Sequence, residues 1–173
     1  MTEIGEPAPE IDLLDLDGNP HSLQMYRGKL VVLNFWSAEC PWTARADKAT
    51  APLVGTWDDR VVVLSIASNA NETRQEIAES AKARRVSPVL LDADQSAARV
   101  YGAQITPEIF VIDTRGILRY KGAFSDANFR NPELTQNYLE ETVNALLASE
   151  SPEKEHVPAY GCTIYFGDQH SGI

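Results

Sequence analysis

The chain has 173 residues, which suffices for a single domain with a sizeable hydrophobic core. Hydrophobic residues make up 43% of it and charged residues 23%, as is usual for a soluble globular protein. The formal net charge of -10 argues against nucleic acid or an anionic membrane as a partner. No apolar run approaches the roughly 20 residues of a membrane span, and the N-terminus lacks a secretory signal, so we expect a cytoplasmic location.

The first half of the chain alternates short apolar runs with helical patterns. Asp17-Gly18 is a turn signal inside a predicted hairpin, and Pro52 is expected to kink or divide the first helix. Asn71 or Thr73 is the expected N-cap of the second helix. The predicted elements are a hairpin over 11–23, a strand over 30–36, a helix over 41–57, a strand over 61–66 and a helix over 73–85.

The second half continues this alternation and ends in a polar tail. Its predicted elements are a strand over 89–91, a helix over 94–101 closed by Gly102, an antiparallel hairpin of 109–112 with 117–120, and a helix over 132–148. This order predicts an α/β domain over residues 1–149, with a central mixed sheet and helices on both faces. Residues 150–173 form an extended tail that carries the second cysteine.

Cys40 is the most informative residue, because it follows a buried strand and directly precedes Pro41. The proline suits the first turn of a helix, where its missing N–H costs nothing. A thiol at a helix N-terminus lies near unpaired N–H groups and the positive end of the macrodipole, which favour the reactive thiolate. The alternative is that Cys40 is a small buried hydrophobic residue.

Two stretches resemble the thioredoxin-like redoxins, the superfamily of the alkyl hydroperoxide reductase and thiol-specific antioxidant proteins. They are DLDGNPHSLQMYRGKLVVLNFWSAECP and YGAQITPEIFVIDTRGILRYKG. The resemblance implies a thioredoxin-like fold and a cis peptide bond between Thr106 and Pro107, beside the reactive cysteine. It also implies a substrate groove there; the substrate-binding residues that we expect are Trp36, Pro41, Trp42, Thr106 and Pro107. The alternative for Pro107 is an edge-strand turn.

The sequence departs from a thioredoxin at two positions of the active turn. Thr43 stands where a thioredoxin has its second cysteine, so a dithiol cannot close within the turn. The Thr43 hydroxyl is instead expected to donate to the Cys40 thiolate and to assist catalysis. Asn34 stands where thioredoxins carry a buried acid, and no internal base for a resolving thiol is evident.

The sequence also departs from a typical peroxiredoxin. Leu33 stands where a typical peroxiredoxin has a proline, Ser37 stands at the position of its threonine or serine, and Thr106-Pro107 stands in place of an activating arginine. Arg45 either compensates for that arginine or is a solvated helix residue. Glu39 beside the thiol disfavours the thiolate. A thiol peroxidase is therefore the less favoured alternative.

The tail turns apolar around Cys162. Residues 157–166 resemble the C-terminal Gly-Cys-x-Ile segment of a bacterial subgroup of these redoxins, although Tyr165 and the short ending depart from it. The resemblance implies that Cys162 pairs with Cys40 and acts as the resolving thiol. Alternatively, Cys162 only packs in a strand added to the sheet edge.

The remaining polar residues predict no other chemistry. His21, His156 and His170, with Asp168 near the last, match no metal-ligand spacing, and we predict neither a metal nor a cofactor. We expect an enzyme that exchanges protein or small-molecule disulfides, with peroxides as the alternative substrate and an unidentified thiol as electron donor. A non-catalytic module that binds peptide beside Pro107 is the competing class.

Overall fold

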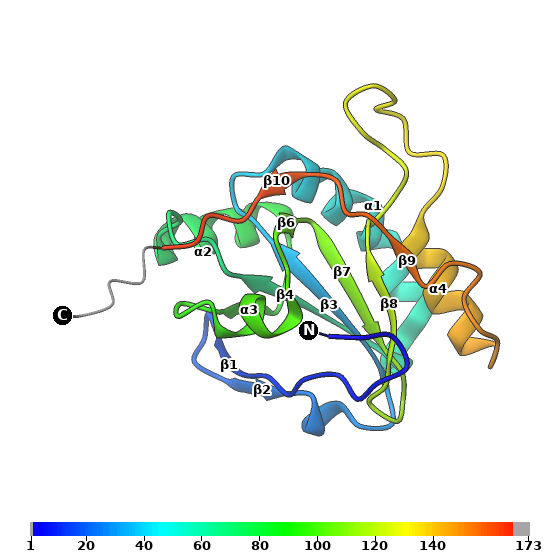
Figure 1. The fold of residues 1–173 in the computed structure, drawn as a ribbon. Helices are drawn as coiled ribbons and strands as arrows, with labels where there is room; N and C mark the ends of the chain where they lie inside the picture. Colours follow the sequence, from blue (N-terminus) through cyan, green and yellow to red (C-terminus); the bar gives the residue numbers. More distant parts are fainter. Residues whose placement is uncertain (1, 168–173) are drawn as a thin grey trace.

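The computed structural model describes residues 2–167 (Figure 1). Its helices are α1 (Pro41–Trp57), α2 (Arg74–Arg84), α3 (Ser96–Tyr101) and α4 (Tyr138–Leu147), with 3-10 turns η1 (Gln24–Tyr26) and η2 (Asp58–Arg60). Its strands are β1 (Asp12–Asp15), β2 (Pro20–Ser22), β3 (Leu30–Trp36), β4 (Val61–Ala67), β5 (Val89–Leu91), β6 (Ile105–Thr106), β7 (Glu108–Ile112), β8 (Leu118–Gly122), β9 (His156–Val157) and β10 (Cys162–Thr163). None of these helices has the length and apolar character needed to cross a bilayer.

Eight strands form one mixed sheet in the order β2-β1-β5-β4-β3-β7-β8-β9. Strand β3 runs parallel to β4, because α1 crosses over between them, and antiparallel to β7. Strands β10 and β6 pair separately, as an antiparallel two-stranded unit. The mixed sheet and the N-terminal hairpin of β1 and β2 confirm the predicted thioredoxin-like architecture.

The core lies on both faces of β3, all of whose residues are buried. Val31, Leu33 and Phe35 alternate with their neighbours and pack toward α3. Leu30 and Val32 point the other way, toward α1 and α4. Figure 1 shows α3 separated by the sheet from α1 and α4, so the expectation of helices on both faces is confirmed.

Local sequence patterns predicted the ends of several helices and strands correctly. Strand β3 and helix α1 have their predicted bounds. Thr73, one of the two candidate caps, is the N-cap of α2 and forms a capping box with Glu76. Gly102 ends α3 with a positive φ of 70°, a conformation that glycine adopts at little cost.

Two features of the helices differ from the predictions. Helix α1 is not divided at Pro52, which is exposed, so the carbonyl one turn earlier can bond to solvent. Helix α4 begins at Tyr138 rather than at residue 132. Its cap is Asn137, whose side chain accepts from the backbone N–H of Glu140, while the preceding residues are held in a loop.

Candidate active site

Cys40 lies at the junction of β3 and α1, where it is the helix N-cap and is only 2% exposed. Its backbone is extended, with φ -76° and ψ 118°, and Pro41 occupies the first helical turn. The carbonyl of Cys40 accepts from the N–H of Ala44 at 3.1 Å, which starts the helical ladder. The chain therefore presents the sulfur at a helix N-terminus, as the sequence predicted.

The tail brings Cys162 onto Cys40. The two sulfurs lie 2.6 Å apart, and both cysteines are free. A disulfide bond measures about 2.05 Å, so forming one needs only a small approach of the two atoms. Cys162 reaches this position because β10 pairs with β6, with Cys162 opposite Thr106. The strand addition and the thiol contact thus occur together.

Thr106 and Pro107 complete the wall beside the thiols. Their peptide bond is cis, as predicted, and both residues are buried. The Cys40 sulfur lies 3.3 Å from the Thr106 carbonyl oxygen. The Thr106 hydroxyl donates to the Cys162 carbonyl at 3.4 Å. A second cis bond, before Pro88, was not predicted.

The environment shifts the two thiol pKa values in opposite directions. Burial alone would raise the pKa of Cys40, but hydrogen bonds from Cys162, Thr43 and Thr106 outweigh it and hold the pKa below its ordinary value. Burial, the bond to Cys40 and the nearby Cys40 and Glu72 charges raise the pKa of Cys162 to about 12. Cys40 is therefore the thiol that ionises first.

Thr43 is fully buried beneath the Cys40 sulfur on α1. Its side chain and backbone N–H both favour the Cys40 thiolate and lower its pKa. No hydrogen bond of full geometry joins its Oγ1 to a protein group within residues 2–167. The Thr43 hydroxyl is therefore available to donate a hydrogen bond to the Cys40 thiolate.

The other predicted substrate residues are divided between surface and core. Pro41 is exposed, and Trp42 is half-buried, where it meets Tyr160 of the tail edge-to-face at 5.1 Å. Trp36 is 0% exposed, and its indole N–H donates to Asp47 at 2.8 Å. Because no substrate can reach a fully enclosed ring in this conformation, the structure places Trp36 in the core instead of the groove.

A buried carboxylate that sequence reasoning missed links the thiol turn to the tail. Oε1 of Glu72, which is 9% exposed, accepts from the Ser37 hydroxyl at 2.8 Å and from the Glu39 N–H at 3.0 Å. The Ser37 oxygen in turn accepts from the N–H of Cys40 at 3.2 Å. On its other side, Oε2 of Glu72 accepts from Asn69 at 3.1 Å.

Asn69 extends this network to the tail. Its side-chain oxygen accepts from the N–H of Tyr165 at 2.8 Å, and the Tyr165 carbonyl accepts from Ala70 at 3.0 Å. A hydrogen-bonded chain therefore runs from Cys40 through Glu72 to the segment that carries Cys162. The sequence feature that could have revealed this network is the acidic residue Glu72 in the loop after β4, because the carboxyl ends of neighbouring parallel strands meet at one edge of a sheet.

Asn34, at the place of the thioredoxin acid, contributes no base. It is 7% exposed, and its Oδ1 has no hydrogen-bond partner among the described residues. No group of three or more potential metal ligands occurs in residues 2–167. His170 and Asp168, which were considered above, lie outside the described residues.

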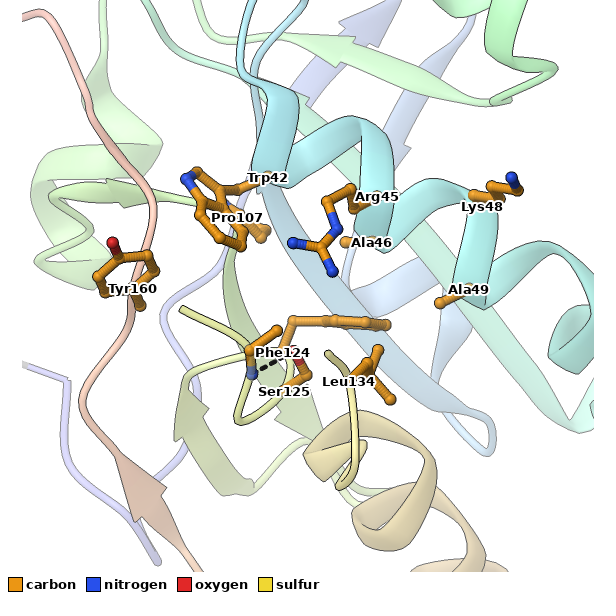
Figure 2. A pocket seen from close by; sticks show the side chains of 11 residues that line it. Trp42, Arg45, Ala46, Lys48, Ala49, Pro107, Phe124, Ser125, Leu134 and Tyr160 are labelled. Carbon is orange, nitrogen blue, oxygen red and sulfur yellow. Dashed lines mark hydrogen bonds between the residues drawn. The ribbon is translucent and has the colours of Figure 1, made fainter. Parts of the chain in front are cut away.

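A pocket of about 330 Å³ lies next to the thiols (Figure 2). Trp42, Pro107 and Tyr160, which come from the segments around Cys40, Thr106 and Cys162, line its near side. Its lining is completed by Arg45, Ala46, Lys48, Ala49, Phe124, Ser125, Ala127 and Leu134. The site thus combines a thiol pair with an adjacent, largely apolar cavity.

The family of the chain follows from a match over most of its length. The model of the AhpC/TSA family matches residues 4–121, which include Cys40 and Pro107. The chain belongs to the AhpC/TSA family. With the fold above, this makes it a thioredoxin-like redoxin, as its sequence resemblance predicted.

Several relatives of the chain are named as thiol-disulfide oxidoreductases. The chain is 31% identical over 114 residues to the thiol-disulfide oxidoreductase ResA of Geobacillus thermodenitrificans, covering 65% of each chain. It is 31% identical over 123 residues to the thiol:disulfide interchange protein DsbE of Escherichia coli, covering 69% of this chain and 65% of that protein. The chain thus spans slightly less than two thirds of the length of these relatives.

A solved structure matches nearly the whole redoxin, tail included. It is a hypothetical protein from Sinorhizobium meliloti 1021, with 29% identity, a TM-score of 0.87 and 97% coverage of both chains. The thioredoxin domain of a thiol-disulfide oxidoreductase from Bacteroides vulgatus has 20% identity and a TM-score of 0.63, with 76% of this chain covered. The second match supports the fold alone.

Proposed function

We propose that this redoxin is a thiol–disulfide oxidoreductase in which Cys40 is the nucleophile and Cys162 the resolving thiol. The observation that carries the proposal is the 2.6 Å separation of the two sulfurs. The opposite pKa shifts support the order of events, because Cys40 ionises first and Cys162 stays protonated at neutral pH. The names of the relatives, which are those of thiol-disulfide oxidoreductases, support the reaction class.

The proposed reaction transfers two electrons from the thiol pair to a substrate disulfide. The Cys40 thiolate attacks one substrate sulfur, the substrate S–S bond breaks, and the first substrate thiolate leaves. Cys162 then gives up its proton and attacks the Cys40 sulfur, which releases the second thiolate. The substrate thiolates take up two protons, and the Cys40–Cys162 disulfide remains for an external thiol donor to reduce.

The residues around the thiols suit distinct roles in this cycle. Thr43 stabilises the thiolate, while Pro41, Trp42, Thr106 and Pro107 border the substrate. The substrates are protein or small-molecule disulfides. A thiol pair that must return to its reduced state suits the cytoplasm, and fractionation of cells that express the full-length protein tests that location.

Parallel assays of disulfide and peroxide consumption test the proposal. We expect insulin or a small disulfide to be reduced in a reaction that Cys40→Ser abolishes. Fast peroxide consumption without disulfide exchange would assign a thiol peroxidase instead. An inert Cys40 in a folded protein would leave the peptide-binding module as the better account.

A further inference from the structure

The pocket beside the thiols has two basic residues, Arg45 and Lys48, in a largely apolar lining. Figure 2 shows the Arg45 guanidinium extending from α1 into the pocket, between Trp42 and Phe124. Its carbon lies 4.9 Å from the centre of the Trp42 ring, so the two side chains stack. The packing orients the charged group toward the cavity.

Arg45 keeps donors available for a ligand. One nitrogen donates to the Pro132 carbonyl, and a guanidinium has five N–H groups in total. Arg45 forms no ion pair with a carboxylate in residues 2–167. Such a fork matches a carboxylate, which can accept two parallel hydrogen bonds.

The lining of the pocket has a charge opposite to that of the whole protein. The chain carries a net charge of -10, yet no described residue that lines this pocket is acidic. Asp126, in the loop beside it, turns its carboxylate to Thr135 and Gln136. The Lys48 ammonium points away from the cavity in Figure 2, so Arg45 is the cation that faces a ligand.

We propose that this pocket binds the carboxylate-bearing apolar half of a small-molecule disulfide substrate, with the carboxylate on Arg45. The apolar group packs against Trp42, Phe124 and Leu134. A volume of about 330 Å³ lies within the range of small-ligand sites, about 300–1,000 Å³. This inference rests on the proposed thiol–disulfide exchange and names the substrate class for it.

The pocket acts at the mixed-disulfide stage of the reaction. Cys40 attacks the disulfide RS–SR, forms Cys40–S–SR and releases one RS⁻. The retained R group occupies the pocket while Cys162 attacks the Cys40 sulfur and releases the second RS⁻. Tyr160, two residues before Cys162, lines the same pocket, so the docked tail and the bound group touch.

Two disulfides matched in shape but not in charge test the proposal. They are 4,4′-dithiobisbenzoate and 4,4′-dithiobisbenzamide, each reacted with excess reduced protein while aryl thiolate release is followed. The rate for each disulfide is divided by the rate of the same disulfide with mercaptoethanol, which corrects for differences in intrinsic reactivity. We expect thiolate release from the benzoate to reach half of its maximal rate at an about three- to tenfold lower protein concentration than release from the benzamide. This preference should weaken as salt is added.

Arg45→Gln should abolish this preference. Arg60→Gln is the matched control, because it removes the same charge from an exposed arginine on η2, beyond the opposite end of α1 from Cys40. Equal half-saturation for the two disulfides, or a preference that survives Arg45→Gln, would overturn the proposal while exchange itself stands.

A non-reacting ligand separates this proposal from the proposed function. The thioethers 4-(methylthio)benzoate and 4-(methylthio)benzamide cannot exchange, and their binding is measured by calorimetry. We expect tighter binding of the benzoate that depends on Arg45. If neither disulfide reacts but this difference persists, the exchange reaction fails and the anion pocket stands. If neither thioether binds, the pocket assignment is wrong.

Discussion

The two thiols are held by segments of very different construction. Cys40 follows β3, which is fully buried and hydrogen-bonded to β4 and β7 on its two sides. Cys162 lies in the two-residue strand β10, whose one strand partner among residues 2–167 is the two-residue strand β6. The nucleophile is thus fixed by the central strands of the sheet, whereas its partner is held by β6, by the bonds of Tyr165 to Asn69 and Ala70, and by Ile164, which packs into the core. Changes in the tail should therefore alter resolution without unfolding the domain.

The largest difference should appear when each thiol is removed. Cys40→Ser should lower disulfide turnover by on the order of 10³-fold or more, because a hydroxyl cannot replace the thiolate. Cys162→Ser should still attack the substrate once and then stop as a mixed disulfide. Mass spectrometry after one equivalent of disulfide distinguishes these results. Equal loss of the first attack in both variants would contradict the assigned roles.

The next largest effect should come from the close approach of the tail to β6. A Cβ on Gly161 would lie 2.0 Å from the Thr106 carbonyl oxygen, so Gly161→Ala must displace β10. We expect Cys40–Cys162 disulfide formation to slow roughly ten- to hundredfold. Gly167→Ala is the control in the same tail, because its Cβ would meet the Ala70 Cβ at 3.4 Å and the Gln95 Oε1 at 3.9 Å, both at ordinary contact distance. Similar rates for both variants would show that docking at Thr106 is unnecessary.

The substitution of Glu72 should have a smaller effect, because it removes only the hydrogen-bonded link between the Cys40 turn and the tail. In Glu72→Gln, an amide nitrogen in place of Oε2 would face the Asn69 amide, and the link to Tyr165 would be lost. We expect a loss of about 1–3 kcal/mol in unfolding free energy. Loss of the carboxylate charge should also lower the pKa of Cys162, since that charge raises it.

Adding Asn69→Asp to Glu72→Gln supplies a matched rescue. The aspartate can accept from both the glutamine amide and the Tyr165 N–H, and it restores the negative charge. Denaturant unfolding and the pH dependence of Cys162 alkylation measure the two effects. A double variant no better than Glu72→Gln would show that the network does not connect turn and tail.

The smallest effect concerns Thr43. Thr43→Val removes the hydroxyl that favours the Cys40 thiolate, so the pKa of Cys40 should rise and its alkylation at neutral pH should slow a few-fold. Stability should be unchanged or rise by up to about 1 kcal/mol, since the buried Oγ1 lacks a protein hydrogen-bond partner in the described residues. Thr43→Ser keeps the hydroxyl and should retain the parent pH profile. Identical profiles for all three proteins would remove Thr43 from catalysis.

The predictability of the fold depended on whether the relevant contacts were local. The apolar run into Cys40-Pro41 predicted β3 and α1 to the residue, since strand burial and the start of the helix are encoded in neighbouring positions. The start of α4 was misplaced because Asp126 accepts from the N–H groups of Thr135 and Gln136, across about ten residues.

The site was predictable to a similar extent. The thiols, Thr43 and the cis proline were found from sequence patterns and family resemblance, although their roles stay predictions. Trp36 was misplaced because an aromatic residue at a strand end faces either core or groove, and only packing decides which. Glu72 was missed because its importance arises where two loops and the tail meet in space.

Peptide mapping of the full-length protein tests the central claim, that the fixed thiol and the tail thiol form one redox pair. The protein is treated with one equivalent of oxidant, digested without reductant and analysed by mass spectrometry. We expect a single intramolecular disulfide between Cys40 and Cys162, reversed by dithiothreitol. Two free thiols after oxidation, or only intermolecular disulfides, would contradict the account.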